Sequence, residues 1–319
     1  MNISHEVPLA LLETSKFFND FDYALVHLFE KYPEYLDFYM KSVKAGRTVY
    51  LDNSLYELGE AFDPKAYVDW INTLRPTYYI VPDTFWDTGA TIVQAMDWLL
   101  NHKPSVKAES KMIGVAQGAT YEDIRKCYRF MCSVMDMVAF TFKFPNNFVE
   151  NSGEFFKNNY TKVLKKFQPF LPDCSEREAI ATIEQAIIRC AVLDTLYEEG
   201  VIDKTKPHHL LGLQNTLGLE WLKEHFSSYD WLTSIDTSNP IINGLIGKPY
   251  KPHQTICGGR VCNDFEAKPK EVLADFFENQ IDKMQFDIIK HNVLAFRKLA
   301  GNSPEQNYSI IKNEYGYEN

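Results

Sequence analysis

The sequence predicts a parallel α/β fold of the closed TIM-barrel type, with insertions and a C-terminal helical region. Short apolar runs alternate with amphipathic helical patterns over most of the 319 residues. Each run has the length of a buried strand and stops abruptly at a polar residue or a glycine. Apolar residues make up 45% of the chain, which is enough for a large core. This length and alternation fit a barrel better than an open sheet.

The expected strands are short and rich in branched or aromatic residues. They lie at 48–52, 77–83, 111–119, 136–142, 208–213 and 231–236. The first forty residues are also rich in aromatic side chains, but they read as helical, with Gly46 as the stop.

The helical patterns carry recognisable start signals. Asp63 is expected to cap a helix that begins at Pro64, and Thr120, with Asp123 three residues on, to open another. Helices are expected within 54–76 and at 87–102, 120–134, 175–200, 218–226 and 271–301. Residues 1–300 are therefore predicted to form one domain with an insert at about 145–175, followed by a loose tail at 301–319.

The overall charge argues against one class of protein, the nonspecific nucleic-acid binders. A net charge of −10 and a pI of about 5.3 argue against a surface coated with basic residues. A local basic group is nevertheless expected after residue 236, formed by Lys248, Lys251, His253 and Arg260. A second group of lysines, between 157 and 166, reads as solvated surface.

Cysteine usage and hydropathy predict a cytoplasmic protein with free thiols and no membrane partner. The start has no basic segment followed by an apolar one, and no apolar run is long enough to span a bilayer. None of the six cysteines has zinc-site spacing, and Cys257 and Cys262 give only a weak metal signal. We expect no metal and no cofactor.

The residues that end the apolar runs are the candidate site. In a parallel barrel the carboxyl ends of the strands meet at one mouth. Carboxylates and an amide that converge there suit a polar ring and a covalent step, although aspartates at strand ends also cap helices or pair with lysines. These residues are Asp52, Asp83, Gln117, Gly212 and Asp236.

Five segments resemble the tRNA-guanine transglycosylases, in the order of that family. They are YLDNSLY (50–56), YIVPDTF (79–85), GVAQGATYEDIRKCYRFM (114–131), KPHHLLGLQNTLGLEWL (206–222) and SIDTSNP (234–240). The family exchanges guanine in a nucleic acid for a 7-deazaguanine, on a (β/α)₈ barrel.

The resemblance implies a role for each matching residue. Asp236 would be the nucleophile that attacks the sugar C1′, and Asp52 the general acid and base. The remaining positions would bind the purine-like ring: Asp83 and Gln117 at its edge, Tyr56 and Leu211 on its faces, and His209 and Gly212 beside it. A carboxylate can trap an oxocarbenium-like sugar covalently, and a second acid must protonate the leaving nitrogen.

Departures from the family pattern narrow the expectation to the phage and bacterial branch that modifies DNA. Asn53, Ser54 and Leu55 replace a Ser-Gly-Gly, and Thr141 and Phe142 stand where glycines supply backbone contacts. The zinc site is absent, and the loop after Asp236 differs. We therefore expect DNA as the partner, bound by Lys248, Lys251 and Arg260. The second substrate would be a 7-deazaguanine base such as preQ0.

Alternatives stay open. The substrate could be tRNA with the same chemistry, or the barrel could be a non-catalytic base-binding subunit. An unrelated barrel hydrolase with two carboxylates is a third reading, but it does not explain Gln117 and HLLG in this order. The resemblance also leaves a homodimer open.

Overall fold

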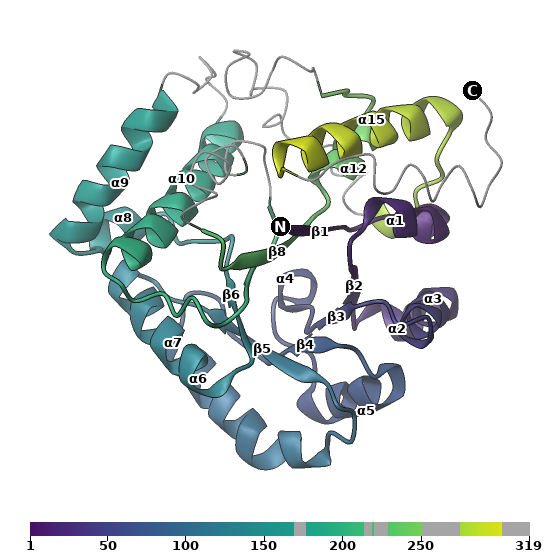
Figure 1. Ribbon diagram of the computed structural model, residues 1–319, viewed down its shortest axis with the longest axis horizontal. Coiled ribbons are helices and arrows are strands. Elements are labelled where there is room, and N and C mark those ends of the chain that lie inside the picture. Colours follow the sequence, from purple (N-terminus) through teal and green to yellow (C-terminus); the bar gives the residue numbers. More distant parts are fainter. Residues whose placement is uncertain (169–176, 214–218, 220–228, 251–274, 302–319) are drawn as a thin grey trace.

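The computed structural model describes residues 1–168, 177–213, 219, 229–250 and 275–301. Within them, eight parallel strands form a nearly closed barrel surrounded by helices, which confirms the predicted (β/α)₈ TIM barrel (Figure 1). Around the barrel the order is β1-β8-β7-β6-β5-β4-β3-β2. The strands are β1 (Asn2–His5), β2 (Asp22–Leu25), β3 (Val49–Asp52), β4 (Tyr78–Ile80), β5 (Lys111–Ala116), β6 (Met137–Phe140), β7 (His208–Leu210) and β8 (Leu232–Thr237).

The helices surround this ring. They are α1 (Leu12–Phe18), α2 (Leu28–Lys31), α3 (Pro33–Lys44), α4 (Leu55–Leu58), α5 (Pro64–Leu74), α6 (Thr88–Asp97), α7 (Tyr121–Val134), α8 (Phe148–Asn151), α9 (Glu154–Phe167), α10 (Arg177–Glu198), α12 (Asn239–Leu245) and α15 (Lys283–Leu299). The short α4 lies over the centre of the ring in the view of Figure 1. The expected insert holds α8 and α9. The expected helix at 218–226 and the tail beyond 301 fall outside the described residues, except for Leu219. No helix in the described ranges has the length and hydropathy to cross a bilayer.

The expected caps are present. The Asp63 side chain accepts a hydrogen bond from the N–H of Ala66 at the start of α5, and that of Thr120 accepts one from Asp123 at the start of α7. Each bond satisfies a backbone donor that the first helical turn cannot pair internally. These caps fix where α5 and α7 begin relative to the strands before them.

The prediction that the first forty residues are helical was wrong in two places, because they contain β1 and β2. Each strand has only four residues, and β2 is buried along its whole length. A short strand buried on both faces shows no polar alternation, so its sequence cannot be distinguished from a helix segment.

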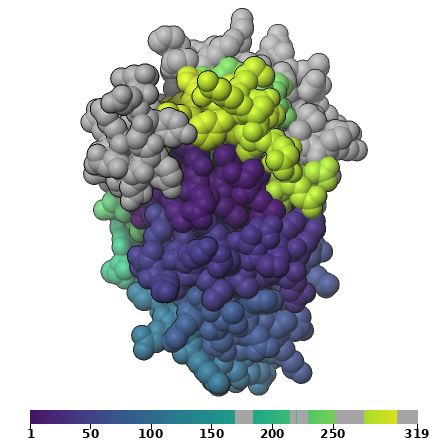
Figure 2. Space-filling view, turned by 90° about the vertical axis from the view of Figure 1, so that its right-hand side faces the viewer, coloured from purple at the N-terminus to yellow at the C-terminus, as the bar shows by residue number. Residues whose placement is uncertain are grey.

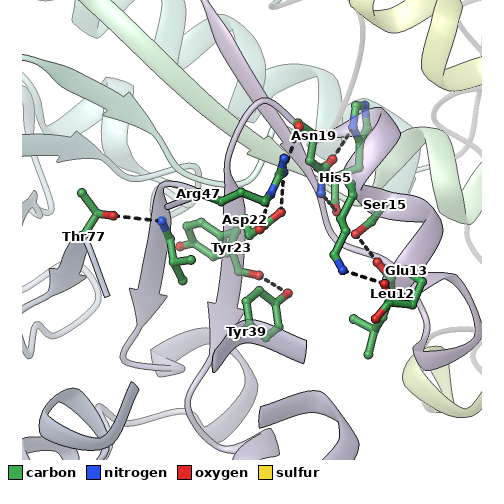
Figure 3. A network of polar contacts seen from close by, with 12 residues as sticks. His5, Leu12, Glu13, Ser15, Asn19, Asp22, Tyr23, Tyr39, Arg47 and Thr77 are labelled. Carbon is green, nitrogen blue, oxygen red and sulfur yellow. Dashed lines mark hydrogen bonds and ion pairs between the residues drawn. The ribbon is translucent and has the colours of Figure 1, made fainter. Parts of the chain in front are cut away.

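The barrel closes between β1 and β2 through side chains rather than a strand ladder. The N–H of Ile3 donates to the Asp20 carboxylate at 2.9 Å. The N–H of His5 donates to the Asn19 side chain at 2.6 Å (Figure 3). The N–H of Asp20 donates to the Ile3 carbonyl at 2.8 Å. The edge of β1 is therefore satisfied by the segment that leads into β2.

The helix α15 covers this closure from outside. In Figure 2 it lies against the N-terminal elements. Its Arg297, which is buried, donates to the Phe18 carbonyl at 2.7 Å and to the Asp20 carboxylate at 2.8 Å. On its other side α15 packs closely on α12, where a Cβ at Gly244 would lie 2.3 Å from Cγ1 of Ile289. The helix α15 thus connects the segment that leads into β2 with α12, which follows β8.

Candidate active site at the carboxyl mouth of the barrel

The predicted catalytic and base-binding residues lie near the carboxyl ends of strands or in the segments that follow them. Asp52 ends β3, Gln117 follows β5, and Asp236 is the last residue but one of β8. Asp83 follows β4 by three residues, and His209 lies in β7. We call the region that these side chains surround the mouth.

The Asp236 carboxylate is held from two sides. Nε2 of His209 lies 2.9 Å from Asp236 Oδ1, and the backbone N–H of Gly212 lies 3.1 Å from both carboxylate oxygens. The other ring nitrogen of His209 contacts the Ser234 hydroxyl at 2.9 Å, and the ring is fully buried. Gly212 has φ of +51°, a left-handed conformation that favours glycine. This arrangement fixes the direction in which the carboxylate faces.

Among the predicted site residues, Asp52 has the pKa that lies furthest from its usual value. One of its oxygens accepts from the Tyr23 hydroxyl at 2.5 Å, and the other accepts from the N–H of Ser54 at 2.5 Å. Burial and the neighbouring Glu57 raise the pKa of Asp52 to about 8, although the two hydrogen bonds act in the opposite direction. A carboxyl group with that pKa is able to give and take a proton near neutral pH.

Tyr23 connects the two aspartates. Its ring stacks on that of His209 with 5.8 Å between centroids, while its hydroxyl donates to Asp52. His209 in turn contacts Asp236. The two carboxylates therefore lie on either side of one packed pair of rings in the barrel interior.

Two further acids share the mouth. Glu6 follows β1, and Glu57 lies on α4, where it is accessible to solvent. Burial, followed by the charges of Glu57, Asp236 and Asp52, raises the pKa of Glu6 well above its usual value. Desolvation by the surrounding protein likewise raises the pKa of Glu57, with a smaller contribution from Asp236, although solvent reaches part of this side chain. These neighbouring acids therefore oppose one another's ionisation, so the mouth holds protons near neutral pH.

Asp83 and Gln117 form a buried pair beside this acidic group. The Gln117 amide donates to Asp83 Oδ2 at 2.8 Å, and the Asn53 amide donates to Oδ1 at 2.8 Å. Burial raises the pKa of Asp83 to about 6, against the effect of these two bonds. Each carboxylate oxygen keeps a second lone pair for another donor.

The departures noted in the sequence have structural counterparts here. Asn53, which the resemblance aligns with a serine, donates its amide to Asp83. Ser54, which it aligns with a glycine, has a left-handed backbone with φ of +59°, and its N–H donates to Asp52. Phe142 packs against Gly212, where a Cβ would lie 2.8 Å from its ring, and against Tyr56, with 5.1 Å between ring centroids. Phe142 therefore stands between Tyr56 and the segment that contains Leu211.

Tyr56 and Leu211, predicted to hold the two faces of a ring, differ in exposure. Tyr56 is 55% exposed, whereas Leu211 is partly buried against the core. The Leu211 carbonyl accepts from the guanidinium of Arg189 on α10, which is buried. Burial lowers the pKa of Arg189 to about 10, and the charge of Asp236 opposes that shift.

Sequence reasoning missed Glu6, Tyr23, Glu57 and Arg189. Glu6 and Tyr23 belong to the stretch that reads as helical, so neither could be placed at the mouth. Arg189 does have a signal in the sequence, because it interrupts the apolar run at 186–193 on an otherwise regular helix. A cation inside such a run indicates a buried partner.

The predicted basic group is only partly described. Lys248 follows α12, and its backbone carbonyl accepts from Asn292 at 3.0 Å. Lys251, His253, Arg260, Cys257 and Cys262 lie outside the described residues. Among the described residues, no group of three or more His, Cys, Asp or Glu side chains is arranged to hold a metal ion.

The fold and the mouth define a parallel TIM barrel with paired aspartates at its carboxyl end. Comparison with protein-family models gives no match, and comparison with curated proteins gives none either.

Proposed function

We propose that this protein is a base-exchange transglycosylase that replaces guanine in DNA by a 7-deazaguanine. The observation that carries the proposal is the convergence of three arrangements at one mouth. These are a carboxylate oriented by His209 and Gly212, a carboxyl group with raised pKa at Asp52, and the buried Asp83–Gln117 pair. The resemblance of five segments to the tRNA-guanine transglycosylases supports the same chemistry.

In the first half-reaction, an oxygen of Asp236 attacks C1′ as the glycosidic C–N bond breaks. The bonding electrons leave with guanine, and the proton of Asp52 neutralises its nitrogen. The negative charge of the attacking Asp236 carboxylate favours the oxocarbenium-like character of the sugar. The product is a glycosyl ester on Asp236.

In the second half-reaction, the incoming base gives its N–H proton to Asp52 and attacks C1′. The ester bond breaks, and Asp236 recovers its carboxylate. The pKa of Asp52, raised to about 8, suits both directions, because one group must donate a proton in the first half and accept one in the second.

The Asp83–Gln117 pair suits the edge of a guanine-like base. Such an edge presents two neighbouring N–H donors, and a carboxylate can accept both. Gln117 offers an amide beside it. The face of the base would lie against Tyr56, whose exposed ring is free to take a flipped base.

DNA is favoured over tRNA by the basic group at Lys248, Lys251 and Arg260, which departs from the tRNA-type loop. Purified protein should incorporate labelled guanine into DNA and not into tRNA at matched salt. Incorporation into tRNA alone would replace DNA by the tRNA alternative. Incorporation into neither would remove the proposed activity. Mass analysis of nucleosides from cells that express the protein with a deazaguanine supply gives a second readout.

A further inference from the structure

Four aromatic rings and one lysine form a surface at the edge of the mouth. They come from the segments that follow β3, β4 and β6, so they share the mouth's end of the barrel. We call this surface the aromatic rim; it consists of Tyr56, Phe85, Trp86, Phe142 and Lys143. Tyr56 is 55% exposed and Trp86 38% exposed, which is unusual for large rings this close together.

Lys143 sits among the rings of the rim. Its ammonium lies 4.9 Å from the centroid of Phe85 and 5.5 Å from those of Tyr56 and Trp86. Among the described residues, no carboxylate is within ion-pair distance of it. The rim therefore offers a positive charge that ring faces hold in place and that no described acid neutralises.

Trp86 is fixed in a conformation that few non-glycine residues adopt. Its φ is +63°, its indole N–H donates to the Lys143 carbonyl at 3.1 Å, and its backbone N–H points at Gln117 Oε1 at 3.5 Å. Strained backbone of this kind persists where surrounding contacts over-determine it, and it clusters at functional sites. The Trp86 backbone thus contacts Gln117, while its indole is fixed to the segment that follows β6.

The groups at this end of the barrel suit one strand of nucleic acid. The mouth is lined by the carboxyl groups of Asp52, Asp236 and Glu6 rather than by the cations that phosphate prefers. A phosphate next to the target nucleotide must therefore lie outside the mouth, near a cation. Aromatic faces that alternate with a cation are the usual means of holding unstacked bases without reading their sequence.

We propose that the aromatic rim binds the unstacked nucleotide next to the target, with its base on Trp86 and Phe85 and its phosphate at Lys143. The inference rests on the proposed function, since it assumes that the mouth receives a nucleotide from a polynucleotide. It adds a second base site to the one that Tyr56 and the Asp83–Gln117 pair provide. It also assigns the partner a locally melted or single-stranded form.

Binding of a fluorescent single-stranded thymidine oligonucleotide tests the rim without requiring exchange. Trp86→Ala and Lys143→Gln should each weaken binding by roughly 5- to 100-fold. Lys143→Gln should also reduce the slope of log affinity against log salt by about 0.7. Trp86→Ala replaces one non-glycine residue by another, so the left-handed backbone costs about the same in both proteins. Matched controls are Leu100→Ala, which removes another exposed apolar side chain, and Lys44→Gln, which removes a lysine on α3.

Three results would overturn the inference. The first is oligonucleotide affinity in both variants equal to that of the controls. The second is an equal loss of affinity for free guanine, which would make the rim a support for the base pocket. The third is an equal loss on a fully paired duplex, which would reduce the rim to a backbone contact. Failure of exchange by the wild-type protein, with oligonucleotide binding intact and rim-dependent, would instead reject the proposed function alone.

Discussion

Asp52 and Tyr23 show how one hydrogen bond sets the chemistry of a residue. Burial raises the pKa of the Asp52 carboxyl to about 8, and the Tyr23 hydroxyl holds it lower than burial alone would. If Asp52 protonates the leaving base, it must carry its proton when the bond breaks. The rate of guanine release should therefore fall as pH rises above about 8.

Tyr23→Phe should move that alkaline limb to higher pH. The substitution removes a donor that stabilises the charged carboxylate, so the pKa of Asp52 rises further and the group stays protonated to higher pH. The measurement is the pH profile of guanine release in a single turnover. Tyr67→Phe is the control, because it removes a buried hydroxyl that donates to the Leu51 carbonyl instead. If the alkaline limb of the pH profile lies at the same pH in Tyr23→Phe as in the wild-type protein, Asp52 does not transfer the proton.

Asp83→Ala should weaken binding of free guanine by roughly ten- to a hundredfold, since losing one partner of a buried polar contact costs on the order of 1–3 kcal/mol. Selectivity among purines should relax as well, because Gln117 loses the partner that orients it. Calorimetry measures both effects, with Asp69→Ala on the exposed side of α5 as the control. If the affinity of Asp83→Ala for free guanine equals that of the control, Asp83 supports the fold and does not contact the base.

The residues that sequence could place are those that end a readable strand. Asp52, Gln117 and Asp236 each interrupt an apolar run, and the parallel topology brings such ends together. Glu6 and Tyr23 could not be placed, because β1 and β2 carry no signal that separates them from helix. The pairing of Gln117 with Asp83 needs the side-chain geometry of two adjacent strands, which the sequence does not contain.

At the scale of the elements, closure of the barrel depends on α15. Strands β3 to β8 were predictable from their apolar runs, whereas the joint between β1 and β2 is made by the side chains of Asn19 and Asp20. Arg297 supports that joint from a helix that follows more than 270 residues later in the chain. A contact of that sequence separation has no local pattern, so sequence reasoning could predict the helix but not its role.

Arg297→Met should destabilise the fold by about 3–5 kcal/mol. The methionine keeps much of the apolar packing but leaves the Phe18 carbonyl and the Asp20 carboxylate without their buried donor. The free energy of unfolding in urea gives the value. Lys41→Met, which breaks the exposed pair of α3 with Asp37, should change stability by less than about 1 kcal/mol. Equal effects of the two variants would mean that α15 does not hold the closure.

At the scale of the whole molecule, charge is distributed unevenly. The chain carries a net charge of −10, and four of its acids, Glu6, Asp52, Glu57 and Asp236, lie at the mouth. Nucleic acid is attracted to such a protein where cations are concentrated. The predicted basic group at Lys248 and Lys251 and the lysine of the aromatic rim are two candidates for such a place.

The double variant Lys248→Ala with Lys251→Ala should lower duplex DNA affinity and flatten its salt dependence by about 0.9 for each phosphate that these lysines no longer neutralise. Binding of free guanine should not change, since the proposed base pocket is formed by Asp83, Gln117 and Tyr56. The measurement is DNA affinity over a series of salt concentrations, and Lys157→Ala with Lys162→Ala on α9 is the control. If the salt dependence of the double variant equals that of the control, DNA does not bind at this basic group.

The covalent bond to Asp236 gives the most direct test of the proposed chemistry. Wild-type protein incubated with guanine-containing DNA and then denatured should retain a nucleic-acid adduct that mass spectrometry maps to Asp236. Asp236→Asn should keep its fold and its affinity for free guanine, yet form no adduct and exchange no base. Near-normal exchange by Asp236→Asn, or an adduct on a different residue, would contradict the central claim.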